Sequence, residues 1–133
     1  MKKFVLIVAG GSGTRMKNKI PKQFIELNGM PLLMHTLKAF NRLNPPVDFI
    51  LVLPVNEHKT WENLCAKHNF LVNHKVIKGG RTRFNSVKNG LAEIKEEGIV
   101  FIHDGVRPLV SVQTLRNCYN TALEKGNALP VIP

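Results

Sequence analysis

Short, continuous apolar runs recur along this chain, and segments with helical apolar spacing separate them. The runs are Phe4–Val8, Phe49–Leu53 and Ile99–Ile102, and a weaker, partly alternating stretch covers Leu71–Ile77. A continuous apolar run of this length is typical of a strand that is covered on both faces. The chain is therefore predicted to build a sheet from mostly buried strands.

The segments between these runs carry apolar residues at helical spacing, with residues that favour helix ends beside them. Pro31 is a favourable first residue for a helix whose apolar stripe runs from Leu33 to Phe40. Asn56 is predicted to cap a helix in which Trp61, Leu64 and Cys65 share a face. A third helix is predicted to begin at Thr82 and to end at Gly98, with Phe84, Val87, Leu91 and Ile94 facing inward. A fourth is predicted to begin at Ser111 and to end at Gly126, with Leu115, Cys118 or Tyr119, Ala122 and Leu123 facing inward.

This alternation of strand and helix implies right-handed crossovers, and so an α/β fold with helices on both faces of a mostly parallel sheet. Ligands of such sheets bind outside the carboxyl ends of the strands. Four loops fall there, which are Ala9–Met16, Leu53–Asn56, Lys78–Arg83 and His103–Pro108. The same loops hold unusual combinations of glycine and charged residues, so we expect the functional site among them.

The length and composition of the chain are typical of a single globular domain. A chain of 133 residues suits one domain, 44% hydrophobic residues suffice for a core, and no apolar run is long enough to span a membrane. The apolar run after Lys2 and Lys3 is too short for a secretory signal, so we expect the first strand of a cytoplasmic protein. Cys65 and Cys118 lie far apart and are expected to be reduced packing residues.

The formal charge of +10 comes from 19 Lys and Arg against 9 Asp and Glu. Two basic windows without acidic residues contribute most of it, one before Glu26 and one from Asn63 to Ala92. If both windows converge on one cleft, they suit a small, multiply charged anion. Most charge runs are solvated faces without a ligand, and a basic chain can also bind nucleic acid, so charge alone does not decide.

The first loop, "AGGSGTRM", fits neither of two familiar phosphate-binding motifs. Counted from Gly10, the second glycine of a P-loop falls on Arg15, and counted from Gly11, the dinucleotide fingerprint ends at Met16. Three glycines in four positions still allow main-chain N–H groups to approach anionic oxygens, and the guanidinium of Arg15 adds a permanent charge. A tight strand-to-loop turn without a ligand explains the glycine spacing equally well.

The other loops offer further candidates. Lys22 follows the first loop in "PKQ", and Ser86 lies in the first turn of a helix whose N-terminus could hold polar or anionic groups. Asp104 comes at a strand's carboxyl end, where a carboxylate suits Mg²⁺, although it could also accept bonds from nearby main-chain N–H groups or pair with Arg107. His103 is expected to be a packed residue outside the chemistry.

Taken together, "AGGSGTRM", "PKQF", "GGRTRFNSV" and "HDGVRP" resemble, in order and spacing, the cytidylyltransferases that act on sugar-alcohol phosphates. The members that use 2-C-methyl-D-erythritol 4-phosphate, in the non-mevalonate isoprenoid pathway, are the most similar. The resemblance implies a Rossmann-like, three-layer nucleotidyltransferase fold, with residues 1–133 as the CTP-binding part of a single domain that is incomplete at its C-terminus. It also implies a homodimer for the complete enzyme, and neither a nucleic acid nor a membrane as partner.

The resemblance assigns roles to individual residues. Arg15 and Lys22 match the two positive charges that stabilise the transition state, and Asp104 matches the Mg²⁺ ligand. Arg83 matches a recurring basic position. The positions that the resemblance places around CTP are Ala9, Gly10, Gly11, Ser12, Gly13, Thr14, Gly80, Ser86 and Gly105.

Two departures from the family pattern leave alternatives open. Arg81 stands where many relatives carry an acidic residue that helps to place the nucleotide. The relatives also continue beyond the position of Pro133 with residues that hold the acceptor. Ribitol 5-phosphate therefore remains an alternative acceptor, a non-catalytic nucleotide-binding domain an alternative function, and a nucleic-acid-binding module an alternative class.

Overall fold

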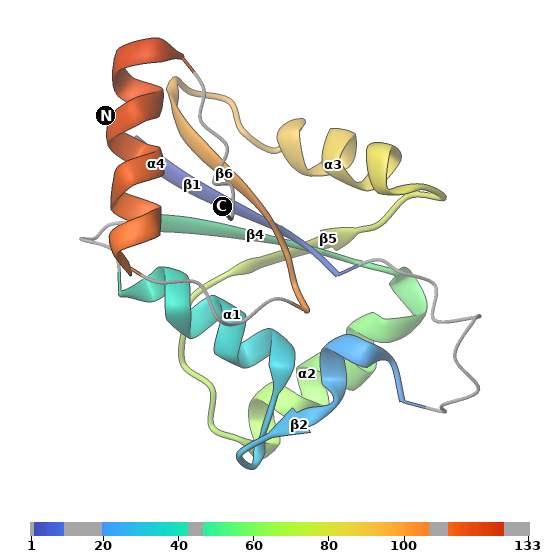
Figure 1. Ribbon diagram of the computed structural model, residues 1–133. Helices are drawn as coiled ribbons and strands as arrows, with labels where there is room; N and C mark the ends of the chain where they lie inside the picture. The colour runs from blue at the N-terminus through green and yellow to red at the C-terminus, as the bar shows by residue number, and fades with distance from the viewer. Residues whose placement is uncertain (1, 10–19, 43–46, 107–111, 127–133) are drawn as a thin grey trace.

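The structure is a computed structural model that describes residues 2–9, 20–42, 47–106 and 112–126. In this part of the chain, four parallel strands form one sheet in the order β5-β4-β1-β6 (Figure 1). The strands of this sheet are β1 (Lys2–Val8), β4 (Val47–Leu53), β5 (Lys75–Lys78) and β6 (Gly98–Asp104), and a separate hairpin pairs β2 (Glu26–Leu27) with β3 (Met30–Pro31). The three continuous apolar runs thus form strands as predicted, whereas the weaker fourth strand begins only at Lys75.

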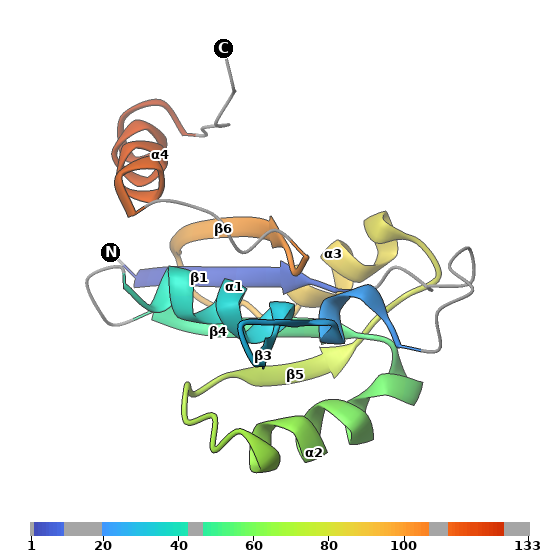
Figure 2. The same cartoon turned by 60° about the horizontal axis from the view of Figure 1, so that its bottom comes forward.

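Helices lie on both faces of the sheet, as the alternation predicted. Figure 1 shows α1 and α2 on one side of the strands and α3 on the other, and Figure 2 shows α4 beyond the β6 edge. Their bounds are α1 (Leu32–Asn41), α2 (His58–Lys67), α3 (Arg83–Leu91) and α4 (Val112–Lys125), with 3-10 turns η1 (Lys22–Phe24) and η2 (Val55–Glu57).

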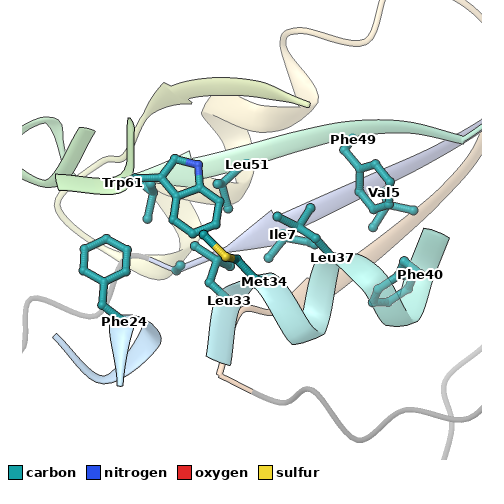
Figure 3. Close-up of a cluster of buried hydrophobic side chains, with 12 residues drawn as sticks. Val5, Ile7, Phe24, Leu33, Met34, Leu37, Phe40, Phe49, Leu51 and Trp61 are labelled. Atoms are coloured by element: carbon teal, nitrogen blue, oxygen red, sulfur yellow. The ribbon is translucent and has the colours of Figure 1, made fainter. Parts of the chain in front are cut away.

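Two apolar clusters, one on each face of the sheet, make the core. Because side chains of a strand alternate between faces, Val5 and Ile7 of β1 join one cluster while Leu6 and Val8 join the other. The first cluster includes Leu33, Met34, Leu37 and Phe40 of α1, and Figure 3 shows them beneath β1 and β4. Each such side chain contributes about 1.5–3 kcal/mol when it is fully buried.

Trp61 of α2 fixes η1 to the rest of the molecule. Its ring stacks on that of Phe24 at 6.1 Å between centroids and 11° between planes (Figure 3). Its indole Nε1 donates to Nε2 of His74 at 2.9 Å, and Nδ1 of His74 lies 2.8 Å from the carbonyl oxygen of Val72. The segment that contains Lys22 is therefore anchored on a fully buried aromatic residue.

The inward face predicted for the segment that contains α3 is confirmed at Val87 and Ile94, which pack against the second core cluster, and is wrong at Phe84 and Leu91. Phe84 and Leu91 are 74% and 41% exposed, while Ser86 and Gly90 are buried. A Cβ built on Gly90 would lie 2.2 Å from Cδ1 of Leu6, so the smallest residues let the helix approach the sheet. The helix also ends at Leu91 rather than continuing to Gly98, which instead opens β6.

Two other local predictions were wrong and two were confirmed. Asn56 does not cap α2, because it lies inside η2 and the helix follows directly from Glu57. The strand β6 is only half-buried, with Ile102 45% exposed, because it is an edge of the described sheet. Thr82 does cap α3, and Gly126 follows α4 with a φ of 89°, a backbone conformation that favours glycine.

Cys65 and Cys118 are unpaired thiols that are half-buried rather than fully buried. Burial raises the pKa of the Cys65 thiol to about 11, which makes it a poor nucleophile, as expected of a packing residue. Among the described helices, none is long and apolar enough to cross a membrane. The predicted cap Ser111 and the predicted strand at residues 128–132 lie outside the described residues.

Candidate functional site

The carboxyl ends of the four parallel strands are joined by main-chain hydrogen bonds from the residues that directly follow β1, β5 and β6. The bonds run from Ala9 N to Val52 O at 3.0 Å, from Gly105 N to Val8 O at 3.0 Å and from Gly79 N to Leu53 O at 2.8 Å. The first residues of three of the predicted loops therefore lie along one edge of the sheet. This edge is where parallel sheets bind ligands.

The turn after β5 is built closely around Gly80. A Cβ at this position would lie 2.5 Å from Cβ of Asn85, so a side chain would displace the first turn of α3. The main-chain N–H of Gly80 donates to the hydroxyl of Ser86 at 3.0 Å, and Ser86 is 1% exposed. Ser86 thus has a structural partner, although a hydroxyl that accepts one bond can still donate one.

A groove of about 490 Å³ opens beside this turn. Its walls come from the segment after β4, from the end of β5 with the turn that follows, and from the last part of α3, and Arg81 is an exposed residue of its lining. The rest of the lining is Pro54, Val55, Asn56, Lys78, Gly79, Gly80 and Asn89. Main-chain groups and two cationic side chains give this groove the character of a site for a polar or anionic molecule.

Lys22 is exposed on η1, and a buried hydrogen-bond network begins at the next residue. The side-chain amide of Gln23 donates to the carbonyl oxygen of Ala9 at 3.1 Å and to the carboxylate of Glu57. Burial raises the pKa of Glu57, and the Gln23 bond and the charge of His58 oppose that shift. The sequence reasoning missed Gln23 and Glu57, and the only signal for them was the position of Gln23 within "PKQ".

Asp104 is the last residue of β6 and lies opposite Val8 in the register. Both main-chain groups of the next residue, Gly105, form hydrogen bonds. Its N–H donates to the carbonyl of Val8, and its carbonyl accepts from the hydroxyl of Thr36 at 2.9 Å. A Cβ on Gly105 would lie 2.9 Å from Cβ of Ala9, so the two loops touch here. This contact brings two predicted site segments, Ala9 and Asp104–Gly105, side by side.

The donor set fits Mg²⁺ only if a substrate shares the ion. Mg²⁺ is commonly held by one or two carboxylates together with substrate phosphates. Within the described ranges, no group of three or more His, Cys, Asp or Glu side chains could hold a metal ion. The carboxylate of Asp104 therefore suits an ion that arrives with a phosphorylated ligand.

Other predicted site residues fall in different places. Arg83 is exposed at the first position of α3. The ring of His103 packs edge-on against Phe40 at 4.9 Å between centroids, as expected of a packing residue. Gly10, Gly11, Ser12, Gly13, Thr14 and Arg15 lie outside the described residues, as does Arg107.

The two basic windows converge only in part. Three of their residues, Lys78, Arg81 and Arg83, lie at or just beyond the carboxyl end of β5, and Lys22 precedes Gln23, which bonds to Ala9 directly after β1. In contrast, Lys75 begins β5 and pairs with Glu93. Lys2 likewise begins β1 and pairs with Asp48 and Glu96, at 3.1 and 2.7 Å from its Nζ.

A second hollow of about 460 Å³ lies at the opposite, amino ends of β1, β4 and β5. Its carboxylates Asp48, Glu93 and Glu96 are those that pair with Lys2 and Lys75. Paired charges and a position at the amino ends both argue against a ligand here, so we place the candidate site at the carboxyl ends.

Comparison with known proteins gives one consistent family. The profile of the 2-C-methyl-D-erythritol 4-phosphate cytidylyltransferase family matches residues 3–133. Relatives named 2-C-methyl-D-erythritol 4-phosphate cytidylyltransferase include one from Bacteroides thetaiotaomicron, 48% identical over 132 residues, and one from Porphyromonas gingivalis, 50% identical over 133 residues. Both matches cover 99% of this chain.

A solved structure supports the same relationship. The crystal structure of 4-diphosphocytidyl-2C-methyl-D-erythritol synthase from Anaerococcus prevotii matches with a TM-score of 0.72 and 30% identity, over 93% of this chain and 52% of that one. The predicted Rossmann-like α/β nucleotidyltransferase fold is thereby confirmed. The chain spans 60% and 59% of the length of the two relatives above.

Proposed function

The chain belongs to the 2-C-methyl-D-erythritol 4-phosphate cytidylyltransferase family, and we propose that its protein transfers a cytidylyl group from CTP to 2-C-methyl-D-erythritol 4-phosphate. Pyrophosphate is the second product. The observation that carries this proposal is the contact between Ala9 and Gly105 at adjacent strand ends, one strand away from the Gly79–Gly80 turn. These are the segments that the family resemblance assigns to CTP.

In this proposal the nucleoside and the triphosphate of CTP occupy two different parts of the site. The groove beside Gly80 and Arg81 has a volume of about 490 Å³, which suits a nucleoside. Its main-chain groups could form hydrogen bonds with the edge of a base. The triphosphate would then extend towards Ala9, where the glycine-rich segment begins. Lys22 would be close to it, because the next residue, Gln23, donates a hydrogen bond to the carbonyl of Ala9.

The reaction needs charge neutralisation more than proton transfer. A phosphate oxygen of the acceptor attacks the α-phosphorus of CTP, the bond from that phosphorus to the bridging oxygen breaks, and pyrophosphate leaves with the electron pair. The acceptor phosphate is already ionised at neutral pH, so no general base is required. Lys22 and Arg15 would reduce the repulsion between the two anions and stabilise the charge that develops in the transition state.

Asp104 would hold Mg²⁺ together with phosphate oxygens of the nucleotide. When bound, the ion would neutralise phosphate charge and orient the triphosphate. The role of Asp104 in this proposal is therefore to fix one ligand position at the end of β6, which the contacts of Gly105 with Thr36 and Ala9 hold in place.

The acceptor, the homodimer and the cytoplasm as location are further parts of the proposal. Ribitol 5-phosphate is the alternative acceptor, because it presents a similar phosphate on a polyol chain. CTP is a cytoplasmic metabolite, which supports the proposed location.

The test incubates the protein that contains this chain with CTP, Mg²⁺ and each acceptor in turn, and measures pyrophosphate. The proposal expects release that depends on 2-C-methyl-D-erythritol 4-phosphate and is much slower with ribitol 5-phosphate. Equal or faster release with ribitol 5-phosphate would reassign the acceptor. Absence of release with both acceptors, together with absence of CTP binding, would refute the proposed function.

A further inference from the structure

Gln23 is the middle residue of η1 and is almost completely buried, with 3% of its surface exposed. A side-chain amide carries two N–H donors on one nitrogen. In this chain its Nε2 lies 3.1 Å from the carbonyl oxygen of Ala9 and also donates to Oε1 of Glu57. The amide therefore connects two segments that follow the neighbouring parallel strands β1 and β4.

The hydrogen bond from Gln23 also stabilises the buried carboxylate of Glu57. Glu57 is 8% exposed, and a buried carboxylate is unfavourable without hydrogen-bond donors. Its position is fixed by the main chain, because the N–H of Glu57 donates to the carbonyl of Pro54 at 2.9 Å. Glu57 thus orients the amide, so that the second N–H of Gln23 faces Ala9.

The residues on either side of Gln23 extend the effect of this anchor. Phe24 is buried and stacks on Trp61, so the main chain after Gln23 is also held. Lys22, directly before Gln23, is exposed and belongs to the same short turn. Anchoring Gln23 and Phe24 therefore fixes the main chain from which the Lys22 side chain extends.

We infer that Gln23 is a positioning residue, whose buried amide holds the carbonyl of Ala9 and the main chain of Lys22 at a constant spacing, and that Glu57 orients this amide. The inference rests on the proposed function, in which the triphosphate lies between these two elements. A displacement of about 1 Å in a site that works by positioning can lower the rate about 100-fold. Loss of the amide should therefore slow the chemical step while the fold persists.

The test compares kcat and the KM for CTP in Gln23→Leu, Glu57→Leu, Glu57→Gln and Glu62→Leu. Gln23→Leu removes both donors at nearly constant volume, and Glu57→Leu removes one acceptor. Both are expected to lower kcat, by about 10- to 100-fold for Gln23→Leu and by less for Glu57→Leu, with a smaller change in KM. Glu57→Gln keeps an acceptor oxygen and should retain most activity, while Glu62→Leu makes the Glu→Leu change at an exposed position of α2, the helix that follows Glu57.

A second measurement separates positioning from general loss of stability. In the wild type, Lys22→Ala should lower the rate by orders of magnitude, but in the Gln23→Leu background it should lower the rate much less, because Lys22 is already displaced. Thermal unfolding by circular dichroism would show that each variant is folded. If Gln23→Leu does not fold, Glu57→Leu combined with Lys22→Ala supplies the same comparison.

Two results would overturn the inference. Folded Gln23→Leu and Glu57→Leu proteins with wild-type kcat would show that the amide positions nothing of importance to the reaction. Strictly multiplicative effects of the Gln23 and Lys22 substitutions would show that the two residues act independently. Both results require an active wild type, whereas an inactive wild type that does not bind CTP would refute the proposed function itself and remove the site that Gln23 serves.

Discussion

Thr36 provides the sharpest structural prediction, because a single hydroxyl joins α1 to the end of β6. The residue is fully buried, and its Oγ1 lies 2.9 Å from the carbonyl oxygen of Gly105 and 3.3 Å from that of Leu32. One hydroxyl proton serves one strong bond, and the shorter distance assigns it to Gly105. Replacement by valine keeps the shape of the side chain and removes only this donor.

The magnitude follows from two opposing terms. A buried carbonyl that loses its donor costs about 1–3 kcal/mol, and burial of a methyl group in place of the hydroxyl returns about 0.8 kcal/mol. The helix propensities of threonine and valine are similar, so they contribute little. We therefore expect Thr36→Val to lower the free energy of unfolding by about 1 kcal/mol, within a range of about 0.2–2.2 kcal/mol. For 133 residues a loss of about 1 kcal/mol corresponds to a fall in Tm of about 4 °C.

The assay is thermal and urea unfolding of Thr36→Val beside Thr60→Val. Thr60 lies on α2 and is exposed, so the same chemical change there should alter the free energy of unfolding by less than about 0.5 kcal/mol. If the account of the Asp104–Gly105 segment is right, Thr36→Val should also weaken CTP binding while Thr60→Val does not. Equal stability of the two variants would show that this hydroxyl does not anchor the end of β6.

Three further predictions follow from the packing. Gly90→Ala should lower the free energy of unfolding in urea by about 1–3 kcal/mol, less a small gain in helix propensity. Adding Leu6→Val should recover part of this loss, because it removes Cδ1 of Leu6, the atom that would clash with the new Cβ. A Gly90→Ala protein more stable than the wild type would contradict this prediction. Because burial raises the pKa of Cys65 to about 11, this thiol should react with iodoacetamide at pH 8 about 100-fold more slowly in the folded than in the unfolded chain. Its contribution to the free energy of unfolding should be complete below about pH 9 and be lost as the pH rises to about 11. Equal alkylation rates in the folded and unfolded chains would contradict the burial of this thiol. His74→Phe should lower the free energy of unfolding by about 1–3 kcal/mol because it leaves the Nε1–H of buried Trp61 without its acceptor, and unchanged unfolding followed by Trp61 fluorescence would show that this bond is unimportant.

The order of the sheet strands and the α-helices could be predicted because each of them has a local signal, whereas the short β2–β3 hairpin was not predicted. Continuous apolar runs gave β1 and β4 closely, and Thr82 gave the start of α3. The rotation of α3 could not be predicted in this way, because periodicity favoured the large residue Phe84 as an inward position. The inward face is instead set by Gly90, whose lack of a side chain allows close contact with Leu6, and that partner is distant in the sequence.

The candidate site shows the same division between local and distant causes. The glycine pair before Thr82 and the carboxylate of Asp104 stand out in the sequence as unusual residues in loops. Gln23 and Glu57 do not, because the amide and its two partners are 14 and 34 residues apart and meet only through the sheet. Lys75 fell in a basic window yet lies at the amino end of its strand, since a window of charge carries no information on strand direction.

In the proposed function, the carboxyl-end edge of the sheet binds CTP, and its cations promote attack at the α-phosphorus. The most direct measurement is kcat/KM for CTP in Lys22→Ala and Arg15→Ala, with Lys67→Ala as the control, an exposed lysine in the last turn of α2. If these cations act at the α-phosphorus, kcat/KM should fall at least about 100-fold in the first two variants with unchanged Tm, and the control should keep wild-type kinetics. Near-normal kcat/KM in both Lys22→Ala and Arg15→Ala would contradict this role.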